Sequence, residues 1–231
     1  MPTILAIDTS AELASTALLH GDRVLSRESS GVHTHSQTIL PLVQSVLHEA
    51  GISLAQCDAI AFGCGPGSFT GVRTACGIVQ GLAFGANLPV IPVVTLLAMA
   101  QACRTLSGAT DVLAVLDARM GEVYWAQYRY VDGWQNVIEP TLSTAEAVTP
   151  QGTVVVCGNG VSAYAAAFEQ SGLATNSQTV IVPHAVQVAE LARVAYARQQ
   201  TLPAREAQPL YLRNKVALTT AERKLKAKAA A

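Results

Sequence analysis

The chain has 231 residues, of which half are hydrophobic and only 13% are charged, and its formal net charge is −1 at pH 7. This length predicts two small domains, and near neutrality argues against tight nucleic-acid binding by this chain alone, because phosphate contacts need clustered Lys and Arg. Residues 74–103 carry no charge but are interrupted by Asn87, Pro89 and Pro92, so no stretch approaches the roughly 20 apolar residues of a membrane helix. Strand alternation and Asp8 come first where a signal peptide would have its long apolar run, so we expect a cytoplasmic protein.

In the first half of the chain, hydrophobic periodicity predicts strand, hairpin, helix, strand, helix and strand. A Gly21-Asp22 turn closes the expected hairpin. The expected strands span residues 4–8, 14–20, 23–28, 59–62 and 90–94, and the expected helices span residues 38–50 and 68–85.

The second half repeats this order, and each half opens with a strand that ends in an aspartate, Asp8 or Asp117. The expected strands are 112–117, 123–131, 134–138, 153–157 and 180–182, with helical segments near Thr144, at 161–171 and after His184. We interpret this as an α/β protein with a duplicated unit: two lobes with mixed sheets flanked by helices, similar to the actin-like ATPase and sugar-kinase fold. The expected lobes are 1–105 and 106–231, and the C-terminal segment is a candidate to pack back on the first lobe.

The segment Gly65-Pro66-Gly67-Ser68-Phe69-Thr70-Gly71-Val72-Arg73 joins a predicted strand to a glycine-spaced helix. Glycine can adopt positive φ, and Ser or Thr can cap a helix, which leaves backbone N–H groups free for an anion. The predicted anion cradle consists of Gly65, Gly67, Ser68 and Thr70. A working P-loop would also need Gly-Lys-Ser/Thr after the glycines, and its absence from the sequence leaves a purely structural role open.

These nine residues resemble the signature of the bacterial TsaB (YeaZ) family, the non-catalytic subunit in tRNA threonylcarbamoyladenosine synthesis. Two further segments, at residues 4–10 (ILAIDTS) and 209–217 (PLYLRNKVA), are similar to the family's opening strand and closing motif. The resemblance implies an actin-like fold and a scaffold subunit required, with TsaD and TsaE, for transfer of the threonylcarbamoyl group to N6 of the adenosine that follows the tRNA anticodon. It also implies that TsaD does the chemistry and that tRNA is held mainly by the partners.

In actin-like ATPases the two aspartate-ended strands lead into loops that wrap nucleotide phosphates, and glycine lets the amides approach closely. Here side chains take those places, in Asp8-Thr9-Ser10 and in Asp117-Ala118-Arg119. We interpret both as degenerate phosphate loops and expect no catalytic residue and no cofactor. In the structural interpretation, Asp8 and Asp117 are strand-end residues that accept hydrogen bonds from turn amides.

The two long helices of the first half are candidates for a partner interface. The first has an apolar stripe wider than one buried face requires, and the second carries Gly77, Gly81 and Gly85, each costing about 0.8–1.0 kcal/mol relative to alanine. Those glycines indicate a close approach either to the chain's own sheet or to a second subunit. The family resemblance implies that the two helices mediate homodimerisation or, alternatively, pairing with TsaD. The expected interface residues are Ile39, Leu42, Val43, Val46, Phe69, Val72, Arg73, Cys76 and Gly77. A charge at Val43 or Val46 is expected to break association while preserving the fold.

No metal site is expected, because His33-Thr34-His35 has the spacing of an extended loop and neither His-Glu-x-x-His nor His-x-x-x-His occurs. The five cysteines lack a Cys-x-x-Cys pair, so we interpret them as reduced and buried. The basic segment at 221–228 is expected to be a solvated tail, and Arg213 is expected to make a structural hydrogen bond.

Two alternatives stay open. An autonomous actin-like ATPase or small-molecule kinase would use Asp8, Asp117 and the Gly65 loop. A metallopeptidase-like protein is less favoured, because the histidine motif is missing. Nucleotide turnover that is lost in Asp8→Ala would support the first, and metal analysis would test the second.

Overall fold

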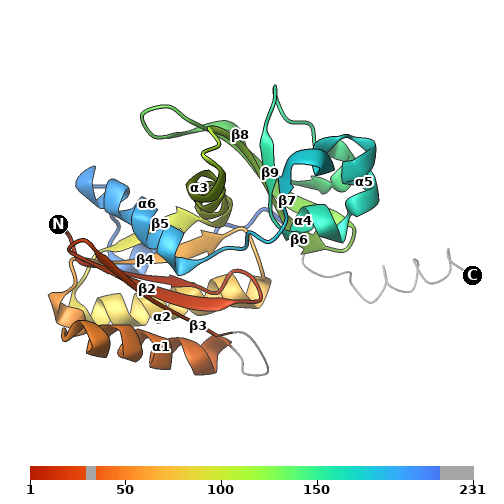
Figure 1. Cartoon of the computed structure of the whole chain (residues 1–231). Helices are drawn as coiled ribbons and strands as arrows, with labels where there is room; N and C mark the ends of the chain where they lie inside the picture. The colour runs from red at the N-terminus through yellow and green to blue at the C-terminus, as the bar shows by residue number, and fades with distance from the viewer. Residues whose placement is uncertain (30–34, 214–231) are drawn as a thin grey trace, which may run out of the picture.

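The computed structural model describes residues 1–29 and 35–213, which form two five-stranded mixed sheets flanked by helices (Figure 1). The expected α/β fold class is confirmed. Among the described residues, no helix has the length and apolar character needed to cross a membrane.

The first sheet has the strand order β3-β2-β1-β4-β5. The central strand β1 pairs antiparallel with β2 and parallel with β4, and all five of its residues are buried because helices cover both faces. The strands of this sheet are β1 (Ile4–Asp8), β2 (Ala14–His20), β3 (Arg23–Ser29), β4 (Ala59–Gly65) and β5 (Val90–Val94).

The second sheet repeats this connectivity in the order β10-β9-β6-β7-β8, with β6 antiparallel to β7 and parallel to β9. Its strands are β6 (Asp111–Arg119), β7 (Glu122–Tyr130), β8 (Trp134–Thr144), β9 (Val155–Cys157) and β10 (Ser177–Gln178). The expected strand at 180–182 is wrong, because the edge strand β10 ends before it and no strand occupies those residues.

Helices form layers around the sheets (Figure 1). The helices α1 (His35–Ala50) and α2 (Phe69–Ala86) cover one face of the first sheet, and α6 (Ala185–Ala197) covers the other. The helix α3 (Thr95–Ser107) packs on one face of the second sheet and contacts α6, while α4 (Asn159–Ala163) and α5 (Ala165–Gln170) lie over the opposite face. The α6 helix therefore comes from the second half of the sequence but packs on the first sheet.

The second-lobe helix expected at 161–171 is divided into α4 and α5. Tyr164 lies between them with φ −128° and ψ 45°, which is outside the helical range. Single-turn 3-10 helices occur at Leu54–Gln56, Ala145–Ala147, Leu173–Asn176 and Ala204–Glu206.

Most of the residues predicted to form the interface on α1 and α2 face the core of this chain and not its surface. Five of the expected interface residues are at most 4% exposed and belong to the core between these helices and the first sheet. These residues are Ile39, Val43, Val46, Val72 and Cys76. Leu42 is half-buried, and only Phe69, Arg73 and Gly77 are exposed. The prediction is wrong for the five buried residues, because the wide apolar stripe of α1 is used to cover the chain's own sheet.

Three glycines of α2, namely Gly77, Gly81 and Gly85, lie on the exposed side of that helix. A Cβ added at Gly77, Gly81 or Gly85 would meet no atom within 4 Å. The interpretation that they press on the chain's own sheet is therefore wrong, and they leave an open helix face. All five cysteines, in contrast, are buried and free, as expected.

We predict that Val46→Asp destabilises the fold instead of breaking association. Val46 is fully buried, so the new carboxylate would be an unpaired charge in the core, and the expected loss is more than about 3 kcal/mol of unfolding free energy. Urea denaturation measures it. Leu40→Asp on the same helix is the matched control, because Leu40 is 43% exposed, and it should keep nearly the stability of the original chain. Equal stability of the two variants would contradict the assignment of faces.

Candidate functional site

The loop after β1 and the start of α2 are in direct backbone contact. A Cβ on Gly71 would lie 1.8 Å from the carbonyl oxygen of Thr9, and a Cβ on Gly67 would lie 2.3 Å from that of Ser10. The Thr9 hydroxyl also donates a hydrogen bond to the Gly71 carbonyl at 2.7 Å. Only glycine fits at these two positions, and the two loops leave no space between them at this contact.

Two amides of the predicted anion cradle, and the nearby amide of Gly71, are used inside the chain. The Gly65 N–H donates to the Thr95 hydroxyl at 3.1 Å, and the Ser68 N–H donates to the Ser10 carbonyl at 2.7 Å. The Gly71 N–H donates to the Ser68 hydroxyl at 3.3 Å, which makes Ser68 the N-cap of α2.

Two details of the cradle prediction are corrected. Gly65 has the expected positive φ of 106°, but Gly67 does not adopt a positive φ. Gly67 is needed for its close approach to Ser10 and not for its φ. Thr70 lies within the first turn of α2 and is not its cap.

Asp8 is buried beneath this contact and is 0% exposed. One carboxylate oxygen, Oδ1, accepts hydrogen bonds from the Ser10 N–H at 3.0 Å and the Ser10 hydroxyl at 2.8 Å. The other, Oδ2, has no hydrogen-bond partner among the described residues and lies against Gly63, where a Cβ would be 1.8 Å from it. Burial raises the pKa of the Asp8 carboxyl above its ordinary value, and the bonds from Ser10 oppose this shift only in part. These contacts match the structural interpretation of Asp8, a strand-end residue that accepts a turn amide.

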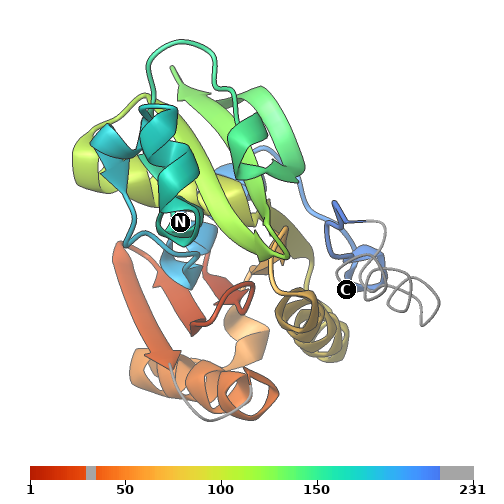
Figure 2. The ribbon, with the colours of Figure 1, turned by 90° about the vertical axis from the view of Figure 1, so that its right-hand side faces the viewer.

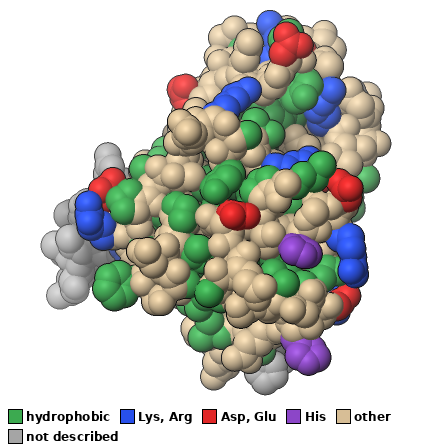
Figure 3. Space-filling model, turned by 90° about the vertical axis from the view of Figure 1, so that its left-hand side faces the viewer, with side chains coloured by type: hydrophobic (Ala, Val, Ile, Leu, Met, Phe, Trp, Pro, Cys, Tyr) green, Lys and Arg blue, Asp and Glu red, His purple; other side chains and the backbone are tan. Residues whose placement is uncertain are grey.

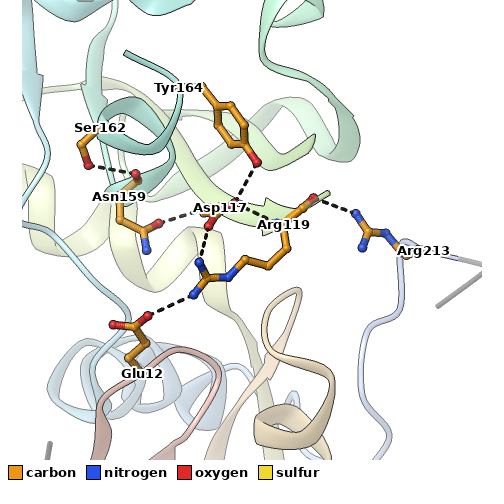
Figure 4. Close-up of polar contacts among 7 residues, drawn as sticks. All are labelled: Glu12, Asp117, Arg119, Asn159, Ser162, Tyr164 and Arg213. Atoms are coloured by element: carbon orange, nitrogen blue, oxygen red, sulfur yellow. Dashed lines mark hydrogen bonds and ion pairs between the residues drawn. The ribbon is translucent and has the colours of Figure 1, made fainter. Parts of the chain in front are cut away.

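Asp117, at the end of β6, is held in a denser network (Figure 4). Its Oδ1 accepts hydrogen bonds from the Arg119 N–H at 2.8 Å and the Tyr164 hydroxyl at 3.1 Å, and its Oδ2 pairs with the Arg119 guanidinium at 3.2 Å. Its own N–H donates to the Asn159 side chain at 3.0 Å. The Asp117 carboxylate is thus paired with a neighbouring guanidinium.

The same guanidinium reaches across to the first lobe. Arg119 Nη2 lies 3.1 Å from Glu12 Oε1, and Figure 2 shows the β6–β7 hairpin pointing toward the first-lobe loops. Between the lobes lies a cleft of about 740 Å³. Its lining includes Ser10, Glu12, His35, Ser68, Phe69, Asp117, Arg119, Tyr124, Asn159, Tyr211 and Arg213. This interlobe cleft is the candidate site.

Residues 210–213, called the closing segment below, form one wall of the interlobe cleft. The Leu210 N–H donates to the Cys64 carbonyl of β4 at 2.7 Å, and the Leu210 side chain packs in the first-lobe core. Leu212 packs in the second-lobe core instead. Arg213 pairs with Glu122 at the start of β7, so the structural hydrogen bonding expected for Arg213 is confirmed. This segment joins the two lobes.

No group of three or more His, Cys, Asp and Glu side chains suited to a metal ion occurs within residues 1–29 and 35–213. His35 is the first residue of α1, and its Nε2 lies 3.2 Å from the Glu12 carbonyl. His33 and the basic segment at 221–228 lie outside the described residues.

Sequence reasoning missed three residues of the interlobe cleft network: Glu12, Asn159 and Tyr164. One signal was available for Asn159, because Gly158-Asn159-Gly160 follows a strand as Gly65-Pro66-Gly67 does. A Cβ on Gly158 would lie 2.0 Å from the Val115 carbonyl, so this turn makes the equivalent close approach. Glu12 and Tyr164 carry no such signal.

Comparison with known proteins first defines the class. A family model described as "TsaD: tRNA N6-adenosine threonylcarbamoyltransferase" matches residues 24–229, which is most of the chain. The two lobes and this match define a TsaD-like protein with an actin-like fold.

Similar proteins and a similar solved structure identify the family within this class. The chain is 42% identical over 221 residues to the tRNA threonylcarbamoyladenosine biosynthesis protein TsaB of Escherichia coli K12, covering 93% of this chain and 96% of that protein. It is 40% identical over 226 residues to the Haemophilus influenzae protein of the same name, covering 93% and 94%. The solved structure of YeaZ from Pseudomonas aeruginosa matches with a TM-score of 0.82 and 38% identity, covering 92% of this chain and 100% of that one. The chain belongs to the TsaB (YeaZ) family.

A pair of glycine substitutions tests the backbone contact. Gly71→Ala should destabilise the fold by at least about 2 kcal/mol, because the new methyl would overlap the Thr9 carbonyl. Gly77→Ala, in the same helix, should stabilise it by about 0.8–1.0 kcal/mol, because the methyl enters open space and alanine favours the helix. Chemical denaturation gives both values. Effects of the same sign would contradict the contact.

Asp8 gives a prediction for pH. Because the folded-state pKa is raised, the native state holds the Asp8 proton more tightly than the unfolded chain, so stability from this group is greatest below the unfolded pKa of about 3.9. It is lost as pH rises from there through the folded pKa. We expect Asp8→Asn to be more stable than the original chain at pH 7, with the difference shrinking toward acid pH, when stability is measured at several pH values. A difference that grows toward acid pH would mean that the carboxylate stabilises the fold.

Proposed function

We propose that this chain is a non-catalytic scaffold and regulatory subunit in tRNA threonylcarbamoyladenosine biosynthesis, required with a TsaD-family catalytic subunit and TsaE. The observation that carries the proposal is the contact of the Thr9 carbonyl with Gly71. A phosphate held between these two loops would need the space that the chain's own backbone fills. The relatives named TsaB support the role in this pathway. The filled space between the loops and the paired charges of the interlobe cleft support a non-catalytic role.

The second-lobe loop supports the same proposal. The Arg119 side chain projects into the interlobe cleft and pairs with both Asp117 and Glu12. A nucleotide there would have to displace this pair, and the Asp117 and Glu12 carboxylates would repel its phosphates. The interlobe cleft is therefore better suited to hold the lobes together than to bind a triphosphate.

The exposed faces of α1 and α2 are the surface that we propose for the partner. Phe84 is 84% exposed, Leu40 43% and Phe69 39%, and the open glycines Gly77 and Gly81 let another backbone approach closely. Exposed large apolar side chains on neighbouring helices are typical of protein interfaces. In the absence of TsaD, the same surface would support a homodimer.

tRNA is proposed to contact the complex mainly through the partners. Every lysine of the sequence lies at positions 215–228, outside the described residues. On the face drawn in Figure 3, basic side chains are scattered among acidic ones and form no continuous patch. Such a surface lacks the clustered cations that phosphate contacts need. These roles place the protein in the cytoplasm.

Light-scattering chromatography tests the proposal. The chain is run alone and mixed with the TsaD-family protein of its own genome, and tRNA modification is assayed on the same fractions with TsaE and activated substrate present. We expect a heteromeric peak and modification only where both chains are present. If no complex forms and the isolated chain hydrolyses nucleotide, the autonomous ATPase is correct and this proposal fails.

We predict that Leu40→Asp weakens association at least tenfold, because a carboxylate would be desolvated in an apolar contact. Leu106→Asp is the matched control. Leu106 is a 70% exposed leucine on α3, away from the proposed surface, and its substitution should leave association unchanged. Titration calorimetry gives the dissociation constants of both variants, which are compared with that of the original chain. Equal weakening by both variants would place the interface elsewhere.

A further inference from the structure

One arginine on the exposed face of α2 is held by aromatic rings. The Arg73 guanidinium carbon lies 3.5 Å from the ring centroid of Phe69 and 5.3 Å from that of Tyr211. Its Nε donates a hydrogen bond to the Tyr211 hydroxyl at 2.6 Å, and the two ring centroids are 6.1 Å apart. These three side chains, called the Arg73 clamp below, join the first turns of α2 to the closing segment of the chain.

The clamp orders the guanidinium without using its outer edge. Among the described residues, neither Nη1 nor Nη2 of Arg73 has a hydrogen-bond or ion-pair partner. Arg73 is exposed and is the only charged residue of α2. Stacking and the Nε bond have already restricted the long side chain, so binding an anion at the free edge costs less conformational entropy than binding it to a mobile arginine.

We propose that the Arg73 clamp is the docking point for a carboxylate side chain of the partner protein. This inference rests on the proposed function and specifies the chemistry of its interface. The two Nη groups form a planar fork, which matches a carboxylate in a bidentate pair. Phe69 and Tyr211 supply apolar area around that pair, and arginine and aromatic residues are the types that dominate binding energy at protein interfaces.

The surroundings favour a protein carboxylate over the phosphates of RNA. Beyond Arg73, the exposed positions of α2 are apolar, small or uncharged, such as Phe69, Gly77 and Phe84. RNA binding needs several cations that track a backbone, whereas a single cation in apolar surroundings fits one carboxylate in a protein interface.

A second copy of this chain does not offer that carboxylate through the same helices. The only acidic residue of α1 and α2 is Glu49, and it pairs with Arg27 of β3. We therefore assign the complementary acid to a different protein, which would make Arg73 a residue that favours the heteromer over a homodimer formed through these helices.

The test compares full-length chains carrying Arg73→Ala, Arg73→Lys or Arg73→Glu for binding to the TsaD-family protein of the same genome, by titration calorimetry at low and high ionic strength. Arg104→Ala is the matched control. The Arg104 guanidinium stacks on Tyr130 at 3.8 Å in the same way, but Arg104 lies on α3. Tyr211→Phe is a second variant that keeps the ring and removes the acceptor of the Nε bond. Thermal melts confirm that each variant is folded.

We expect Arg73→Ala to weaken binding about tenfold or more at low salt, with a smaller difference at high salt. Arg73→Glu should be weaker still, because it faces a carboxylate, and Arg73→Lys should keep only part of the affinity, because it has no fork. Tyr211→Phe should cause a smaller loss, and Arg104→Ala none.

Several outcomes would overturn the inference. If Arg73→Glu binds as well as Arg73→Ala, or both bind like the original chain, no carboxylate meets Arg73. The same variants are assayed for tRNA binding and, by light scattering, for homodimer formation; if they lose only tRNA binding or only the homodimer, the clamp serves RNA phosphates or a second copy. A complex that forms normally with every variant overturns this inference alone, whereas failure of the original chain to form a complex overturns the proposed function as well.

Discussion

The backbone contact between the Thr9 carbonyl and Gly71 determines how α2 is placed at the edge of the first lobe that borders the interlobe cleft. Only hydrogen fits on the Cα of residue 71, so the start of α2 rests directly on the loop that follows β1. That position fixes the rotation of the helix. Since side chains recur every 3.6 residues, Val72 and Cys76 face the sheet while Arg73 and Gly77 face outward. One contact thus closes the gap between two loops and presents the exposed face of α2.

The second lobe repeats the contact and uses it differently. Gly158 lets the turn before α4 approach the Val115 carbonyl of β6, as Gly71 lets α2 approach Thr9. The aspartates at the strand ends then diverge. Asp8 is fully buried, and one of its oxygens has no partner in the described part of the chain, whereas the Asp117 side chain is 11% exposed and borders the interlobe cleft with Arg119. Of the two strand-end aspartates, only Asp117 therefore lines the interlobe cleft.

The sequence predicted most strands and the duplicated order of elements, because β1, β2 and β6 are short, almost continuously buried segments bounded by turns, and a short apolar run of this kind is visible in the local sequence. It did not predict which face of α1 is covered. Val43 and Val46 show helical periodicity, but only the sheet position shows that both are buried. Pairs distant in sequence, such as Glu12 with Arg119, leave no local pattern. The glycine spacing predicted a close approach at Gly77, Gly81 and Gly85, where the structure has open space, and did not predict the close approaches at Gly67 and Gly71.

The closing segment couples the lobes to the surface of α2. Leu210 packs in the first-lobe core and Leu212 in the second, so Tyr211 between them is placed by both lobes at once. Its hydroxyl and ring then order Arg73, which lies 138 positions earlier in the chain. A change in the angle between the lobes would move Tyr211 relative to α2 and loosen the Arg73 clamp. The packing of Leu210 and Leu212 in the two cores therefore links the relative position of the lobes to the arrangement in which the free edge of Arg73 is ordered and available to a partner.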